Sequence, residues 1–90
     1  MPTESIGSCG VATFPYEREQ VLYELELGSA FLRRACPLPD GYSYEVIWRD
    51  HESGPYPEIG IEWDAPLSEP WEWIAKARQE LARFDDPNYR

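Results

Sequence analysis

The middle of the chain alternates apolar and polar residues with a period of two, which predicts strands with one buried face. In residues 42–49 the apolar positions are Tyr42, Tyr44, Val46 and Trp48. In residues 58–64 they are Ile59, Ile61 and Trp63. Residues 50–57 (DHESGPYP) are mostly turn formers and predict a loop. We therefore expect an antiparallel hairpin. Its buried face is expected to carry Tyr44, Val46, Trp48, Ile59, Ile61 and Trp63.

Residues 15–36 predict a helix. Pro15 suits the first helical position, and Arg33 and Arg34 fit the closing turn, where the helix dipole favours positive charge. The apolar residues that recur near one face are Leu22, Leu25, Leu32 and Cys36. Residues 20–27 leave an alternative open, because their apolar positions also alternate with the period of a strand. In that alternative, Ser29 caps a short helix over residues 30–36.

Residues 68–84 predict a second helix, with Ser68 as its N-cap and Pro70 in its first turn. Its apolar stripe is Trp71, Ile74, Ala77 or Arg78, Leu81 and Phe84. The resulting α-β-β-α order predicts one α+β domain over residues 1–90, a small sandwich with the hairpin packed against the two helices. We expect residues 1–8 to be a loose tail, 9–14 to add a short strand and 85–90 to fray.

The charge is concentrated in one part of the chain. The formal net charge is −9, with 17 acids and eight bases. Residues 40–72 hold nine acids and one base, Arg49, a net of −8. So acidic a chain is not expected to bind nucleic acid directly, because phosphate binding needs Lys and Arg. No apolar run approaches 20 residues, and the first ten residues show no secretory signal, so a cytoplasmic protein is expected.

Acids on the second strand are expected to line one face, because every second residue of a strand points the same way, about 6.6–6.8 Å further on. Glu58, Glu62 and Asp64 form this row, and Glu45 joins it from the paired strand. A row of carboxylates at about twice the 3.4 Å phosphate rise of a DNA strand can occupy a groove lined with Lys and Arg. The candidate partner-binding residues are Glu45, Asp50, Glu52, Glu58, Glu62, Asp64, Glu69, Glu72, Tyr56 and Trp73.

Two of these residues are aromatic. We expect Trp48, Trp63 and Trp71 to pack in the core, whereas Trp73 lies off the main stripe of the last helix. Trp73, and Tyr56 at the hairpin tip, are therefore the candidate interface anchors, since aromatic residues are enriched at binding hot spots.

Other chemistry is weakly supported, and we expect no enzymatic activity, no cofactor and no metal. Glu62 and Asp64 as an acid–base pair would need a cleft that exposed strand acids rarely form. His51 matches no hydrolase motif. Cys9 and Cys36 form no CxxC pair, and whether they are free or bridged is left open.

These features favour a monomeric, non-enzymatic protein that binds a basic, nucleic-acid-binding protein. In size, charge and lack of catalytic motifs the chain resembles the small acidic inhibitors of phages and mobile elements, including anti-CRISPR and anti-restriction proteins that imitate DNA. The resemblance implies a CRISPR effector or a restriction enzyme as the target. An immunity or antitoxin protein that neutralises a basic nuclease is the main alternative. A structural or adaptor domain, acidic only for solubility, is another.

Overall fold

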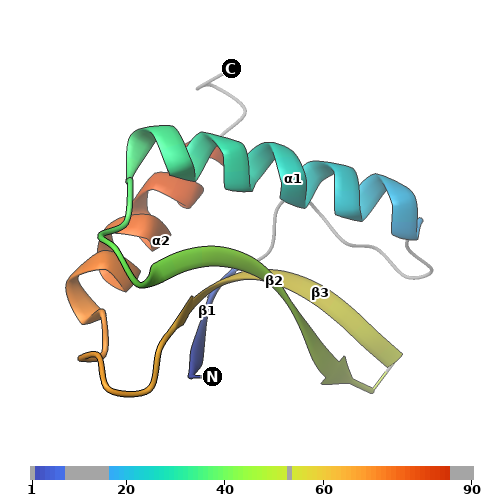
Figure 1. The fold of residues 1–90 in the computed structure, drawn as a ribbon. Helices are drawn as coiled ribbons and strands as arrows, with labels where there is room; N and C mark the ends of the chain where they lie inside the picture. The colour runs from blue at the N-terminus through green and yellow to red at the C-terminus, as the bar shows by residue number, and fades with distance from the viewer. Residues whose placement is uncertain (1, 8–16, 53, 86–90) are drawn as a thin grey trace.

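The computed structural model describes residues 2–7, 17–52 and 54–85, which form a three-stranded antiparallel sheet and two helices (Figure 1). In chain order the elements are β1 (Thr3–Gly7), α1 (Arg18–Ala35), β2 (Tyr42–His51), β3 (Gly54–Trp63) and α2 (Trp71–Asp85). The strand order β1-β3-β2 makes β3 the central strand. The α+β class and the hairpin packed against two helices are therefore confirmed.

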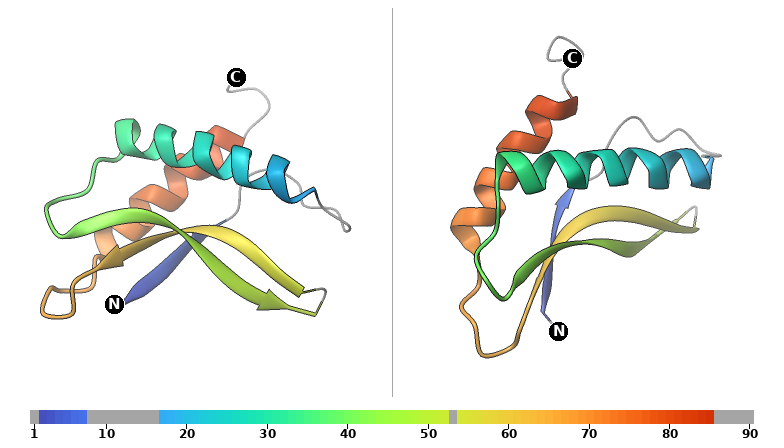
Figure 2. Two further views of the ribbon diagram at one scale, coloured as in Figure 1. Left: turned by 45° about the vertical axis from the view of Figure 1, so that its right-hand side comes forward. Right: turned by 45° about the horizontal axis from the view of Figure 1, so that its top comes forward.

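Both helices lie on the same side of the sheet, where α2 packs over β1 and α1 packs over β3 and β2 (Figure 2). The core between the layers contains Ile6, Leu25, Leu32, Cys36, Tyr44, Ile59, Ile61, Trp63, Ile74, Ala77 and Leu81. Each element contributes apolar residues at its own period, so burial of this layer holds sheet and helices together.

The first helix is confirmed, but it begins at Arg18, with Glu17 in an extended conformation at its N-cap. The strand alternative for residues 20–27 is wrong. Leu25, Gly28 and Leu32 are buried along one face, which is the spacing of a helix and not of a strand. Arg33 and Arg34 lie in the last turn, as the dipole argument predicts.

The expected loose tail contains a strand instead. Thr3–Gly7 pairs antiparallel with β3, with Thr3 opposite Glu62 and Ser5 opposite Gly60. This segment is short and mostly polar, so its own sequence gives little signal. It becomes a strand because β3 offers a free edge and the core accepts Ile6. The strand expected over residues 9–14 lies outside the described residues.

The hairpin is longer than predicted, because the expected loop over residues 50–57 is mostly strand. β2 extends to His51 and β3 begins at Gly54. Two prolines, Pro55 and Pro57, fit inside β3. On the side of β3 that faces β1, pairing starts only at Ile59, so no strand there needs the N–H groups that the prolines lack. β3 also ends one residue earlier than predicted, at Trp63.

The buried face of the hairpin is confirmed for Tyr44, Ile59, Ile61 and Trp63. It is wrong for Val46 and Trp48, which are 42% and 44% exposed. The hairpin curves away from α1 toward its tip (Figure 1), so the helix layer covers only part of β2.

The second helix begins three residues later than predicted, at Trp71, and Ser68 is not its N-cap. The Ser68 carbonyl instead accepts a hydrogen bond from the Tyr42 hydroxyl at 2.7 Å, which fastens the β3–α2 connection to the start of β2. Of the predicted stripe, Ile74, Ala77 and Leu81 are buried, but Trp71 is 59% exposed.

Candidate functional site

The sheet has one face that points away from the two helices, here called the outer face. Strand alternation and register place residues of all three strands on it. They are Thr3, Ser5, Ser43, Glu45, Ile47, Arg49, Tyr56, Glu58, Gly60 and Glu62. Three of the predicted acids, Glu45, Glu58 and Glu62, are therefore brought together on this face.

These three carboxylates surround Gly60. Glu45 lies directly opposite Gly60, while Glu58 and Glu62 lie two residues to either side along β3. Each is thus a diagonal neighbour of Glu45, at about 7–8 Å between Cα atoms. The Ser43 hydroxyl donates a hydrogen bond of 3.2 Å to Glu45 Oε1, which restrains that carboxylate.

An apolar side chain occupies the middle of the outer face. Ile47 lies over Gly60, where a Cβ atom would come within 1.8 Å of Ile47 Cδ1 and 2.9 Å of the Glu4 carbonyl oxygen. Glycine is therefore required at position 60 by close approach from both sides. The result is an apolar centre with an acidic rim, an arrangement typical of protein interfaces.

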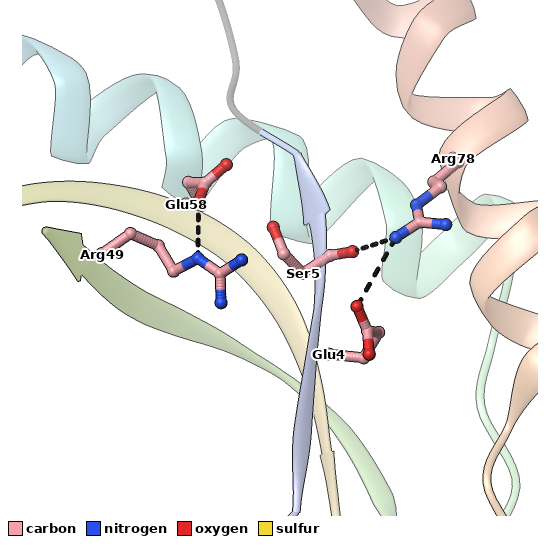
Figure 3. A network of polar contacts seen from close by, with 5 residues as sticks. All are labelled: Glu4, Ser5, Arg49, Glu58 and Arg78. Atoms are coloured by element: carbon pink, nitrogen blue, oxygen red, sulfur yellow. Dashed lines mark hydrogen bonds and ion pairs between the residues drawn. The ribbon is translucent and has the colours of Figure 1, made fainter. Parts of the chain in front are cut away.

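The outer face also carries a base, which reduces its negative charge. Arg49 Nε lies 3.4 Å from Glu58 Oε1 (Figure 3), and the Arg49 side chain is 56% exposed. An exposed pair of this kind stabilises the fold by about 0.2–1 kcal/mol. The pair matters more for the charge of the surface. It neutralises Glu58 and leaves Glu45 and Glu62 as the acids without an ion pair among the described residues of this face.

The other predicted acids lie elsewhere. Asp50 is on the helix side of the hairpin near its tip, and Glu52 lies in the turn. Asp64 follows the end of β3, Glu69 precedes α2 and Glu72 lies in its first turn. All five are exposed. Apart from Asp40, the acids of residues 40–72 therefore divide into an outer-face group, a hairpin-tip group and a group around the β3–α2 connection.

Neither aromatic anchor predicted from the sequence is a fully exposed side chain, and their role at an interface stays a prediction. Tyr56 is only 6% exposed. Trp73 is half-buried against the core, with Lys76 Nζ 5.5 Å from its ring centroid. The exposed tryptophans are Trp71 and Trp48, which sequence reasoning had assigned to the core. The helical period contained a signal for Trp71, because it lies about 100° around the helix from the line through Ala77 and Leu81.

Little in the described residues supports reaction chemistry. No group of three or more His, Cys, Asp or Glu side chains among them is placed to hold a metal ion. Cys36 is a free, buried thiol, and Cys9 lies outside the described residues. The side chain of His51 also lies outside the described part of the structure. Burial raises the pKa of Tyr44, and its contact with Cys36 raises it further. This phenol is thus held neutral as a structural donor.

Comparison with protein-family models, with curated proteins and with solved structures gives no match to the chain. Within the described part of the chain, neither helix is long and apolar enough to cross a membrane. The outer face, with Glu45, Glu58 and Glu62 around Ile47, is the surface on which strand register brings three of the acids expected from the sequence together.

Proposed function

We propose that the protein is a non-enzymatic binding protein whose acidic outer face docks on a basic, nucleic-acid-binding surface of another protein. The observation that supports this proposal is the grouping of Glu45, Glu58 and Glu62 on a sheet face that neither helix covers. Carboxylates held on a sheet are preorganised, so little side-chain freedom is lost on binding.

The electrostatics fit a partner that normally binds phosphates. A surface of this charge attracts a basic groove over a distance of about 8–10 Å at ordinary ionic strength. Complementary charges of this kind raise the association rate and set orientation more than they raise affinity. Affinity then comes from apolar contacts, for which Ile47 lies at the centre of the acidic group.

The partner class follows from the same chemistry. A groove lined with Lys and Arg is the nucleic-acid channel of a nuclease, a restriction enzyme or a CRISPR effector. Occupying it with carboxylates competes with the nucleic acid, so the protein acts as an inhibitor that imitates DNA. The phage anti-CRISPR or anti-restriction role is the specific form of this proposal.

The proposal is tested with a triple variant, Glu45→Gln, Glu58→Gln and Glu62→Gln. Its matched control, Glu17→Gln, Glu19→Gln and Glu26→Gln, removes the same charge from exposed positions of α1 and its N-cap. Tagged forms of both and of the unchanged chain are used to capture host proteins at about 50 mM and 200 mM salt.

We expect the unchanged chain and the control to capture one nucleic-acid-binding protein, less of it at high salt. The outer-face variant should bind it about tenfold more weakly, which corresponds to about 0.5 kcal/mol for each of the three charges. Equal loss in both variants would show that only net charge matters. Equal binding by all three forms would show that the outer face takes no part.

A further inference from the structure

The two edges of the sheet differ in how they are protected. On the β1 edge, Arg78 of α2 donates a hydrogen bond of 2.8 Å to the Ser5 carbonyl and lies 3.8 Å from the Glu4 carboxylate (Figure 3). On the other edge, no described strand pairs with the outer side of β2. An edge of ten residues that no described strand covers is a ready template for another strand.

The prolines of β3 show which backbone groups of β2 point outward. Pro55 and Pro57 lie opposite Asp50 and Trp48 and have no N–H to donate. Hydrogen-bonded and non-hydrogen-bonded pairs alternate in an antiparallel ladder, so the prolines occupy the non-hydrogen-bonded positions. The N–H and C=O groups of Val46 and Trp48 consequently point away from β3, toward the open edge.

The side chains at this edge are apolar where solvent would favour charge. Val46 and Trp48 are 42% and 44% exposed on the helix side of the sheet. Arg18 lies over the Trp48 ring, 5.0 Å from its centroid, and shields one of its faces. Natural edge strands usually avoid such exposure with charged side chains, prolines or bulges. The charged residues of β2 are Glu45, Arg49 and Asp50, and none of them lies between Val46 and Trp48 on the helix side of the sheet.

We infer that β2 pairs antiparallel with β2 of a second copy of this chain, about a two-fold axis at Ile47. In this register Val46 lies opposite Trp48 of the second copy, so the two exposed apolar residues cover each other. On the outer face Glu45 lies opposite Arg49 of the second copy. The symmetry makes each of these contacts occur twice, as in an isologous interface.

Neighbouring registers lack this complementarity. With the axis at Val46, Glu45 faces Ile47 of the second copy. With the axis at Trp48, Ile47 faces Arg49 and Val46 faces Asp50. An axis between two residues places opposite side chains on different faces of the sheet, so the helices of the two copies would not share one side. The sequence of β2 therefore selects one arrangement.

The pairing creates a six-stranded sheet in the order β1-β3-β2-β2-β3-β1, with all four helices on one side. The outer faces of the two copies lie next to each other and face the same way. Two acidic faces pressed together would repel each other, and edge pairing avoids that contact. The inference does not rest on the proposed function, although a dimer would double the length of the acidic surface.

Sedimentation equilibrium of the chain alone over a series of concentrations tests the inference. We expect the mass to rise from 10.5 kDa toward twice that value. Because each copy has a net charge of −9, added salt should strengthen the dimer. The proposed function predicts the opposite salt response for binding to the partner, so the failure of one is distinguishable from the failure of the other.

Two kinds of variant test the register. Glu45→Arg or Arg49→Glu alone creates two like-charged pairs in the dimer and should weaken it about tenfold, whereas the double variant should restore it to within about threefold. Val46→Pro removes an outward N–H and should abolish the dimer, while circular dichroism confirms that the monomer remains folded.

The inference is overturned if the chain stays at 10.5 kDa at every concentration and at high salt. It is also overturned if a dimer forms but the single charge reversals leave it unchanged, or if the double reversal is as weak as either single change. These readouts need no partner protein, so they are independent of the function proposed for the outer face.

Discussion

At the scale of single residues, Tyr44 shows how one hydroxyl joins two elements. It lies in β2, is 8% exposed and donates a hydrogen bond of 2.5 Å to the carbonyl of Cys36, the C-cap of α1. Burial raises the pKa of this phenol, and its contact with Cys36 adds to the effect. The folded protein therefore keeps a proton that the unfolded chain releases above about pH 10.

This difference predicts how stability depends on pH. The contribution of Tyr44 is fully present below about pH 10 and is lost above it, at up to about 1.4 kcal/mol per pH unit, because the unfolded state binds fewer protons there. Tyr44→Phe should be less stable near neutral pH but should fall less steeply in alkali. Urea unfolding from about pH 8 to pH 11 measures both effects. Tyr23→Phe is the control, since it removes the same hydroxyl from a tyrosine that is 59% exposed.

At the scale of elements, the sequence predicted the helices and strands in which apolar residues recur regularly along one face. The core of the hairpin and the helix α1 follow from Ile59, Ile61 and Leu25, which recur at the right spacing. β1 could not be predicted in this way, because it depends on a partner 52 or more residues away in the chain. The sequence also could not predict that Pro55 and Pro57 lie in a strand. A proline is tolerated at these positions of β3 only because β1 does not extend far enough to pair with them.

The candidate site was predictable to a similar extent. Strand alternation correctly grouped Glu45, Glu58 and Glu62, because their side chains follow the pleat. The pairing of Arg49 with Glu58 was not evident, since it depends on the cross-strand register. The exposure of the aromatic residues was not evident for a related reason: it depends on where the helix layer ends, and local sequence does not contain that information.

The exchange of roles between Trp71 and Trp73 can be tested directly. Trp71 is 59% exposed at the start of α2, so Trp71→Ala should change the free energy of unfolding by less than about 0.5 kcal/mol. Trp73 is half-buried against the core, so Trp73→Ala should cost about 1–3 kcal/mol. Urea unfolding of the two variants compares them. Equal destabilisation would contradict the orientation of α2.

At the scale of the whole molecule, the fold places part of its acidic surface on the side of the sheet away from the core. The helices pack on one face of the sheet, and Glu45, Glu58 and Glu62 lie together on the other face. Such an arrangement opposes folding, because like charges held close together repel each other. As diagonal neighbours, Glu45 and Glu62 have Cα atoms about 7–8 Å apart, and two unit charges at that separation in water repel by about 0.5 kcal/mol.

This repulsion predicts that removing outer-face charge stabilises the isolated protein. The variant Glu45→Gln with Glu62→Gln should be more stable than the unchanged chain by about 0.5 kcal/mol at about 0.01 M salt. The difference should disappear near 1 M salt, where the screening length is about 3 Å.

Glu58→Gln is the control on the same face. Because it loses the ion pair with Arg49, it should be neutral or slightly destabilising. Urea unfolding of dilute protein at both salt concentrations measures these differences. If the double variant is no more stable at low salt, the carboxylates are too well solvated to repel each other. In that case the outer face would offer a basic partner a weaker field than its geometry implies.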